Sequence, residues 1–214
     1  MKIPGALVRV GGFITSPRVY LSIAIHERRG PLEPLAYVIL FSASKWGLRG
    51  LLVAGLAASA IGSFGVTPLE AVTDWAAPWL TSLLVYGAMA IGVLFELFLW
   101  FMWSLFAHAL AKSFNGGGEY AHSLNAVGYA WVTDSASLAS LLVAVASPRL
   151  ALIALLGAFV AWVWKGVVVG IGMSEAHGIS LGKGLASSFF PWLILAVVGS
   201  AIFFLATSWE AWWT

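Results

Sequence analysis

The chain has 214 residues, of which 61% are hydrophobic and only 9% are charged, and its formal net charge is +2. Soluble globular domains carry about a quarter charged residues, so this chain has too little polar surface for a water-soluble body and is predicted to be an integral membrane protein. The small net charge argues against nucleic acid as a partner, and the absence of cysteine excludes disulfides, thiolate zinc sites and a cysteine nucleophile.

Residues 1–34 are predicted to form a cytoplasmic amino-terminal segment that does not cross the bilayer. Within it, the stretch TSPRVYLSIAIHERRG predicts a short helix from Pro17 to about His26, because Ser16 can cap it, proline suits its first position and Gly30 can end it. Its mixture of aliphatic side chains and arginines is typical of a helix that lies in the membrane interface.

Residues 35–214 contain five apolar runs long enough to cross a hydrocarbon core of about 30 Å. They are Leu35–Phe64, Pro78–Phe114, Ser123–Ala146, Leu150–Met173 and Ser187–Thr207. The second run is too long for one straight crossing and must tilt or extend past the bilayer. The sequence therefore predicts an all-α membrane protein, a bundle of five transmembrane helices with a cytoplasmic amino-terminal interfacial helix.

The basic residues predict the orientation in the cell membrane. Those expected on the cytoplasmic side are Lys2, Arg9, Arg18, Arg28, Arg29, Lys112 and Lys183. The opposite side has Arg149 and the acidic residues Glu70, Asp74 and Glu210. The amino terminus is therefore predicted to be cytoplasmic and the carboxyl terminus outside. Tryptophans then gather at the outer interface, as indole rings prefer: Trp75, Trp79, Trp209, Trp212 and Trp213.

The stretch FAHALAKSFNGGGEYAHSLNAVGYAWVTD joins the second and third predicted spans on the cytoplasmic side. Its three consecutive glycines permit a tight reversal of the chain. It lacks the Lys-Ser/Thr pair of a phosphate-binding loop and no strand precedes it, so a plain turn is favoured over a nucleotide site.

Three stretches resemble the Yip1-domain family of membrane proteins. HALAKSFNGGGEYAHSLNAVGYAWV is similar to the family's Gly-rich loop followed by a "vgya" helix. WVWKGVVVGIGMSEAHGISLGKGLASSFFP resembles its fourth span, the following connection and the start of the fifth, and SPRVYLSI fits its Pro-Arg opening. The resemblance covers nearly the whole chain and implies an all-helical domain of five spans.

The resemblance also implies a functional context. Eukaryotic members are linked to membrane traffic and to prenylated Rab-type GTPases, but this chain lacks their long cytosolic extension and looks more like the compact bacterial and archaeal members. No catalytic residue carries over, because the family has no established catalytic motif. Two positions depart from its pattern: Thr133-Asp134 stands where proline often follows "vgya", and Lys165 stands in a usually apolar span.

Asp134 and Lys165 lie deep in the third and fourth predicted spans. Intramembrane charges are costly and usually face the interior of the bundle, so a structural ion pair between them is favoured over an ion or proton pathway. The very short turn between these spans predicts that they pack as antiparallel neighbours. If the two residues do not touch, Asp134 needs another partner, such as Lys45, Arg49 or an ion.

Glu96 is alone in the second predicted span. A carboxyl group bonded to a neighbour, or to Lys45 or Arg49, is favoured over a buried acid that binds a cation. Lys45 and Arg49 are one helical turn apart in the first span, whose true crossing is expected to begin near Trp46. They are predicted to reach cytoplasmic headgroups rather than line a channel.

The four histidines, His26, His108, His122 and His177, fall on or near the cytoplasmic side. Imidazole together with carboxylate suits zinc, so His122, His177 and Glu175 form a candidate metal set. No two histidines have i,i+4 spacing and separate loops would have to converge, so solvated loop histidines are favoured. No cofactor is predicted.

These features favour a non-enzymatic membrane protein that organises membranes or recruits partners at its cytoplasmic face. Its partners would be the lipid bilayer and, within the membrane, another protein or a second copy of the chain. The candidate contact residues in the cytoplasmic loops are Asn115, Gly116, Gly117, Gly118, Glu119, Tyr120, Glu175 and Lys183. The alternatives are a small transporter, channel or lipid-moving protein that uses the intramembrane charges, and an accessory subunit of a larger membrane complex. A membrane enzyme comes last.

Overall fold

The computed structural model describes residues 6–27, 30–63 and 70–208, and every regular element in this part of the chain is a helix. Two short helices, α1 (Ala6–Thr15) and α2 (Pro17–His26), come first. The long helices are α3 (Leu32–Ser63), α4 (Glu70–Ser113), α7 (Ala151–His177) and α8 (Leu181–Ser208). Between α4 and α7 lie α5 (Tyr120–Ala130), the 3₁₀ turn η2 (Trp131–Thr133), α6 (Asp134–Ala146) and the 3₁₀ turn η3 (Pro148–Leu150).

Four helical segments in the described part of the chain are long and apolar enough to cross a membrane. They are Thr81–Ser113, Tyr120–Ala146, Ala151–His177 and Leu181–Leu205. The third and fourth predicted spans, joined by the short turn η3, do pack against each other as α6 and α7. Helix α3 corresponds to the first predicted span but is not among the four, and it carries Glu33, Lys45 and Arg49. The count of five crossings therefore stays a prediction.

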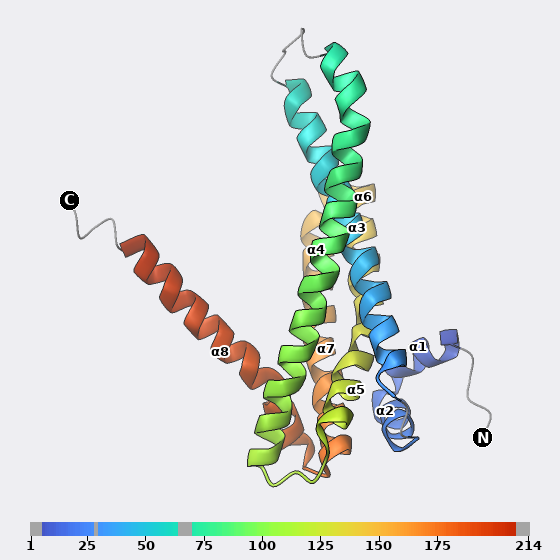
Figure 1. Cartoon of the computed structure of the whole chain (residues 1–214), viewed down its shortest axis with the longest axis vertical. Helices are drawn as coiled ribbons and strands as arrows, with labels where there is room; N and C mark the ends of the chain where they lie inside the picture. The colour runs from blue at the N-terminus through green and yellow to red at the C-terminus, as the bar shows by residue number, and fades with distance from the viewer. Residues whose placement is uncertain (1–5, 28–29, 64–69, 209–214) are drawn as a thin grey trace.

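Helices α3 and α4 pack against each other and form the long hairpin of Figure 1. Gly50 makes the close approach possible, because a Cβ atom there would meet the backbone of Val85 on α4. Small residues at such crossings let membrane helices pack backbone to backbone. Helices α6 and α7 complete the bundle, with α3 packing on α6 and α4 packing on α5.

Helix α2 has the bounds that the sequence predicts, Pro17 to His26. It packs on α7 and α5, so Leu21 and Ile25 are buried in the protein core instead of facing lipid. Val19 and Ile23 stay exposed on its outer side. Only that outer half can meet a membrane surface. That α2 lies in the membrane interface therefore stays a prediction.

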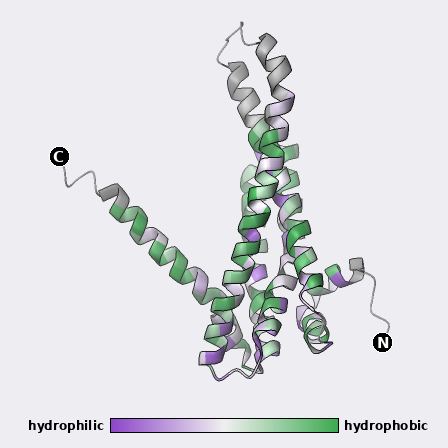
Figure 2. Cartoon of the chain, in the orientation of Figure 1, coloured by the Kyte–Doolittle hydropathy of each residue, from purple (hydrophilic) through white to green (hydrophobic). Residues whose placement is uncertain are grey.

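Helix α8 leaves the bundle. Its first part packs on α7, and the helix then diverges, as Figure 1 shows. Pro191 lies inside the helix at the point where burial ends, and proline removes one helical hydrogen bond and bends a helix. Every residue from Leu193 to Ile202 is exposed, and Figure 2 shows that this part of the helix is hydrophobic. We call residues 193–202 the α8 arm.

The structure describes only some of the residues that the sequence analysis places at the two membrane surfaces. Trp79 is 73% exposed near the start of α4, as an interfacial indole would be. The residues at the chain ends and in short gaps, and some side chains of α2 and α4, lie outside the described residues: Lys2, Arg28, Arg29, Trp209, Glu210, Trp212, Trp213 and the side chains of His26, Glu70, Asp74 and Trp75. The predicted orientation therefore stays a prediction.

Candidate functional site

The third crossing tightens into the 3₁₀ turn η2 between α5 and α6, and its backbone stays right-handed helical there. Such a 3₁₀ stretch inside a helix leaves backbone carbonyl groups with poor partners, and it often marks a functional position. Here hydroxyl groups help to satisfy them: Thr133 Oγ1 donates to the carbonyl of Ala130 at 2.7 Å, and Ser135 Oγ donates to that of Val132 at 2.8 Å. Asp134 follows this turn as the first residue of α6, and its amide donates to the carbonyl groups of Trp131 and Val132.

Asp134 lies at the centre of four buried charges. Its Oδ2 atom accepts from Lys45 Nζ at 2.9 Å and from Lys165 Nζ at 3.1 Å. Lys45 Nζ also pairs with Glu96 Oε1 at 2.5 Å. The four side chains are only 6% to 9% exposed. Two cations therefore balance two anions, and this balance makes their burial in a membrane tolerable.

Tryptophans enclose these charges. Trp131 Nε1 donates to Glu96 Oε2 at 3.2 Å, and Trp46 Nε1 donates to Glu96 Oε1 at 3.4 Å. Lys165 Nζ lies 3.4 Å from the centroid of the Trp131 ring, a cation–π contact that strengthens when water is excluded. Glu96 therefore accepts from Lys45, Trp46 and Trp131. Lys165 is stabilised both by Asp134 and by the Trp131 ring.

The predicted Asp134–Lys165 pair is therefore present in the structure. Glu96 bonds to Lys45, one of the partners that the sequence analysis considered. The prediction that Lys45 reaches the headgroups is wrong, because α3 runs unbroken from Leu32 and carries Lys45 into the bundle. Arg49, one turn further on, is exposed, and its guanidinium carbon lies 4.7 Å from the Trp46 ring centroid.

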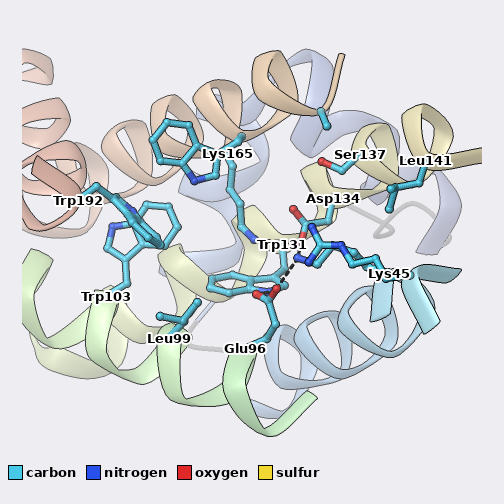
Figure 3. A pocket seen from close by; sticks show the side chains of 13 residues that line it. Lys45, Glu96, Leu99, Trp103, Trp131, Asp134, Ser137, Leu141, Lys165 and Trp192 are labelled. Atoms are coloured by element: carbon cyan, nitrogen blue, oxygen red, sulfur yellow. Dashed lines mark hydrogen bonds and ion pairs between the residues drawn. The ribbon is translucent and has the colours of Figure 1, made fainter. Parts of the chain in front are cut away.

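A cavity of about 230 Å³ adjoins the four charges (Figure 3). Residues from α3, α4, η2, α6, α7 and α8 line it, so that it lies among all the long helices of the bundle. Its charged and tryptophan lining residues are Lys45, Arg49, Glu96, Asp134, Lys165, Trp103, Trp131, Trp162 and Trp192. We call this space the charged cavity. Sequence reasoning missed the role of the tryptophans, although Trp131, three residues before Asp134, was a signal that could have been used.

The three glycines form the predicted turn, and the structure explains why glycine is needed. Asn115 has a left-handed backbone, with φ of 63°, and the amide of Gly116 donates to the carbonyl of Ala111 at 2.9 Å, so α4 ends in a Schellman motif. A Cβ atom at Gly116 or Gly118 would overlap with His177 or its neighbouring carbonyl group. The amide of Gly117 donates to the carbonyl of His177 at 3.0 Å. The loop is therefore docked on the end of α7.

His177 is buried, at 3% exposure, so its prediction as a solvated loop histidine is wrong. Ser123 Oγ lies 2.7 Å from His177 Nε2 and 3.0 Å from His108 Nδ1, and it links α5 to α7 and α4. The glycine loop, residues 116–118, also covers His177 and so contributes to its burial. His108 also meets the Tyr120 ring edge to face, with centroids 5.5 Å apart.

The remaining loop candidates do not gather around His177. Among the described residues, no group of three or more His, Asp or Glu side chains could hold a metal ion, so the set His122, His177 and Glu175 is not brought together as a site. Glu175 instead pairs with Arg18 of α2 at 2.7 Å. Glu119 is exposed at the start of α5, and Lys183 is exposed in the first turn of α8, with its Nζ 5.9 Å from the Phe114 ring centroid.

The family model of the Yip1 domain matches residues 11–202, which is most of the chain. The chain belongs to the Yip1 domain family. No curated protein and no solved structure matches it. Membership and the four candidate spans make it a multi-pass integral membrane protein, and the Yip1 family is in general a family of non-enzymatic membrane proteins.

The two positions where this Yip1 domain departs from the expected pattern meet in space. Thr133 ends the 3₁₀ turn η2, Asp134 supplies the central carboxylate, and Lys165 supplies one of its cations. Asp134 and Lys165 carry opposite charges and pair with each other, so the two departures form one structural feature of this chain.

Proposed function

We propose that this Yip1 domain is a non-enzymatic membrane protein that organises its membrane by binding protein partners, chiefly within the bilayer. The observation that carries this proposal is the α8 arm. It extends away from the bundle and exposes apolar side chains on every side, so within the membrane it is covered by lipid or by another chain (Figure 1).

The small residues of α8 support a protein partner. Gly170 of α7 and Gly184 of α8 lie at the close approach between these helices, where an added Cβ would meet the backbone of the other helix. Gly199, in the α8 arm, has no atom within 4 Å of such a Cβ. Small residues are used in membranes for close helix contacts, so Gly199 offers a contact position that none of the other described residues fills.

The buried charges also favour binding over chemistry. Lys45, Glu96, Asp134 and Lys165 are joined to one another by ion pairs. Removing one member leaves a partner buried and unpaired, so these residues act most simply as a lock between α3, α4, α6 and α7. A rigid bundle with one extended helix suits a protein that presents a surface to others.

The proposed arrangement has five crossings, with α3 as the fifth, a cytoplasmic amino terminus and an external carboxyl terminus. Arg18, Lys112 and Lys183 support it, since they gather at the end of the bundle where α2, α4 and α8 meet α7. Helix α2 would lie on the cytoplasmic leaflet through Val19 and Ile23. Depth measurements with spin labels should place Ile23 at the interface and Leu156 of α7 near the bilayer centre; equal depths would contradict this arrangement.

Site-specific photo-crosslinking in native membranes tests the partner proposal. A photoreactive residue at Val198, which is 48% exposed on the α8 arm, should capture a protein. The matched control is Leu152 of α7, which is 68% exposed and equally apolar, and which should capture mostly lipid. Lipid adducts alone at both positions would refute a protein partner on the α8 arm.

A second candidate function, movement of a small solute or lipid, is favoured by one observation. Asp134 and Lys165 are ionisable residues of the spans that line the charged cavity, and such intramembrane charges often mark substrate or ion pathways. Flux assays in liposomes test it: transport that is lost in Asp134→Asn, while the protein stays folded, would favour this candidate over binding alone.

A further inference from the structure

A second hollow lies next to the charged cavity. It is an apolar groove of about 480 Å³ between α7 and α8, and every residue in its lining is apolar or aromatic: Trp162, Ala186, Phe189, Phe190, Trp192, Leu193 and Ala196. Trp162 and Trp192 line both hollows. Their ring centroids are 5.8 Å apart and the rings are nearly perpendicular, at 79°. These two rings therefore lie where the polar space adjoins the apolar one.

The course of α8 opens the groove towards the membrane. Before Pro191 the helix packs closely on α7, because a Cβ atom added at Gly184 would overlap with the backbone oxygen of Gly170. After Pro191 it diverges, and Leu193 and Ala196 line the groove while remaining exposed. A molecule dissolved in the hydrocarbon layer can therefore enter from the side without crossing a polar surface.

The charged cavity has one positive charge in excess. Lys45 and Lys165 are balanced by Glu96 and Asp134, with which they pair. Arg49 also lines the cavity and takes part in none of the ion pairs between described residues. A ligand group with a single negative charge would balance Arg49, and a planar guanidinium binds phosphate oxygens well.

We propose that the charged cavity and the apolar groove together bind one anionic membrane phospholipid, with its phosphate at Arg49 in the cavity and an acyl chain along the groove past Trp162 and Trp192. A phosphodiester carries the single charge that the cavity requires. The acyl chain accounts for a groove with an entirely apolar lining, which a soluble phosphate would leave empty. The groove lining includes Leu193 and Ala196 from the first turn of the α8 arm, whereas Val198 and Gly199, where the partner contact is tested, lie outside it.

Native mass spectrometry after lipid exchange provides the test. The protein is equilibrated in detergent with equal amounts of palmitoyl-oleoyl phosphatidylglycerol, which is anionic, and the matching phosphatidylcholine, and tightly retained lipid is then counted. The wild-type protein should retain phosphatidylglycerol about fivefold more than phosphatidylcholine, the preference expected of one basic group near an anionic lipid. Equal retention of the two lipids would overturn the proposal.

Two pairs of variants separate the cavity from the groove. Arg49→Gln should lose the preference for phosphatidylglycerol, whereas Arg149→Gln, which removes the same charge at the exposed turn η3, should keep it. Ala196→Trp fills the groove and should lower retention of phosphatidylglycerol severalfold. Ala201→Trp, further along the exposed helix and outside the groove lining, should not. Unfolding temperatures equal to wild type are required of each variant.

Inorganic phosphate distinguishes the two sources of a phosphate group. In millimolar amounts it should not displace the retained phosphatidylglycerol, because it gains nothing from the groove. Displacement by phosphate together with unchanged retention in Ala196→Trp would assign the cavity to a free anion and overturn the proposal. Identical retention in all four variants would mean that only non-specific surrounding lipid is measured, which also overturns it.

Discussion

Lys45 and Asp134 are 89 positions apart in the chain, yet Lys45 Nζ lies 2.9 Å from Asp134 Oδ2 inside the bundle. The same oxygen accepts from Lys165, and the same ammonium group pairs with Glu96. The four helices that carry these residues are therefore tied together at one point. Each of these charges depends on the others for its burial. We therefore expect substitutions of the individual residues to lower the free energy of unfolding by different amounts.

Asp134→Asn should be strongly destabilising, because it leaves Lys165 without a carboxylate. Breaking a buried pair by removing one partner costs about 3–5 kcal/mol in the free energy of unfolding. Lys165→Met should cost less, since Asp134 keeps Lys45. The double variant should lose less than the sum of the two single losses, as is usual for residues in contact. Unfolding in detergent measures all three, with Lys183→Met on the exposed start of α8 as the control; simple additivity would show that the pair does not interact.

Lys45→Met should destabilise the protein more than Lys165→Met does. It leaves Glu96 without its paired cation, whereas loss of Lys165 leaves both Glu96 and Asp134 in contact with Lys45. Arg49→Met, one helical turn along on an exposed position, should change the free energy of unfolding by less than about 0.5 kcal/mol. If Lys45→Met were as mild as Arg49→Met, Lys45 would not be buried in the bundle.

The glycine loop offers a test within three consecutive positions. Gly118→Ala and Gly116→Ala should each cost about 1–3 kcal/mol, because the new methyl group overlaps with His177 or the carbonyl of Ala176. Gly117→Ala should be close to neutral, since its Cβ would meet nothing within 4 Å. Hydrogen exchange at the amide of residue 117, which donates to His177, should speed up in the first two variants only. Equal effects at all three positions would contradict the docked loop.

Ser123→Ala should lower the free energy of unfolding by about 1–3 kcal/mol, because it removes the hydroxyl that links two histidines in a buried place. Ser113→Ala is the matched control, as its hydroxyl makes one local bond to Leu110 at an exposed position. Thermal unfolding in detergent compares the two. A Ser123→Ala protein as stable as the control would mean that the bridge between α4, α5 and α7 contributes nothing.

Much of the helical layout could be predicted from the sequence. The start of α2 follows from Pro17 and the apolar run behind it, although the Ser16 side chain makes no capping hydrogen bond. The long apolar stretches predict the long helices. The Asp134–Lys165 contact was predictable because two opposite charges lie in neighbouring spans joined by a very short turn. These are local patterns, or patterns with one short connection, and they need no knowledge of how distant helices pack.

The place of Lys45 could not be predicted in the same way. Its depth depends on where α3 and the very long α4 cross each other, and this is set by contacts such as that of Gly50 with α4. The 3₁₀ turn η2 was missed because the stretch Trp131–Thr133 contains neither proline nor glycine. The divergence of α8 was also missed, since proline in a hydrophobic run indicates a bend but not its direction. The burial of His177 depends on the docking of a distant loop.

Native co-purification of the Gly199→Leu variant tests the central claim most directly. The protein is extracted from its own membrane in polymer-bounded discs, without detergent, and the proteins in the discs are identified and quantified. A second protein, or a second copy of the chain, should accompany the wild type and Gly87→Leu, in which the new side chain also begins in open space but on α4. Its amount should fall about tenfold in Gly199→Leu, while the unfolding temperature of the isolated chain stays unchanged, because leucine blocks a close helix contact. The same protein content in all three preparations, or wild-type discs that hold one copy of the chain and lipid alone, would contradict a partner-binding role for the α8 arm.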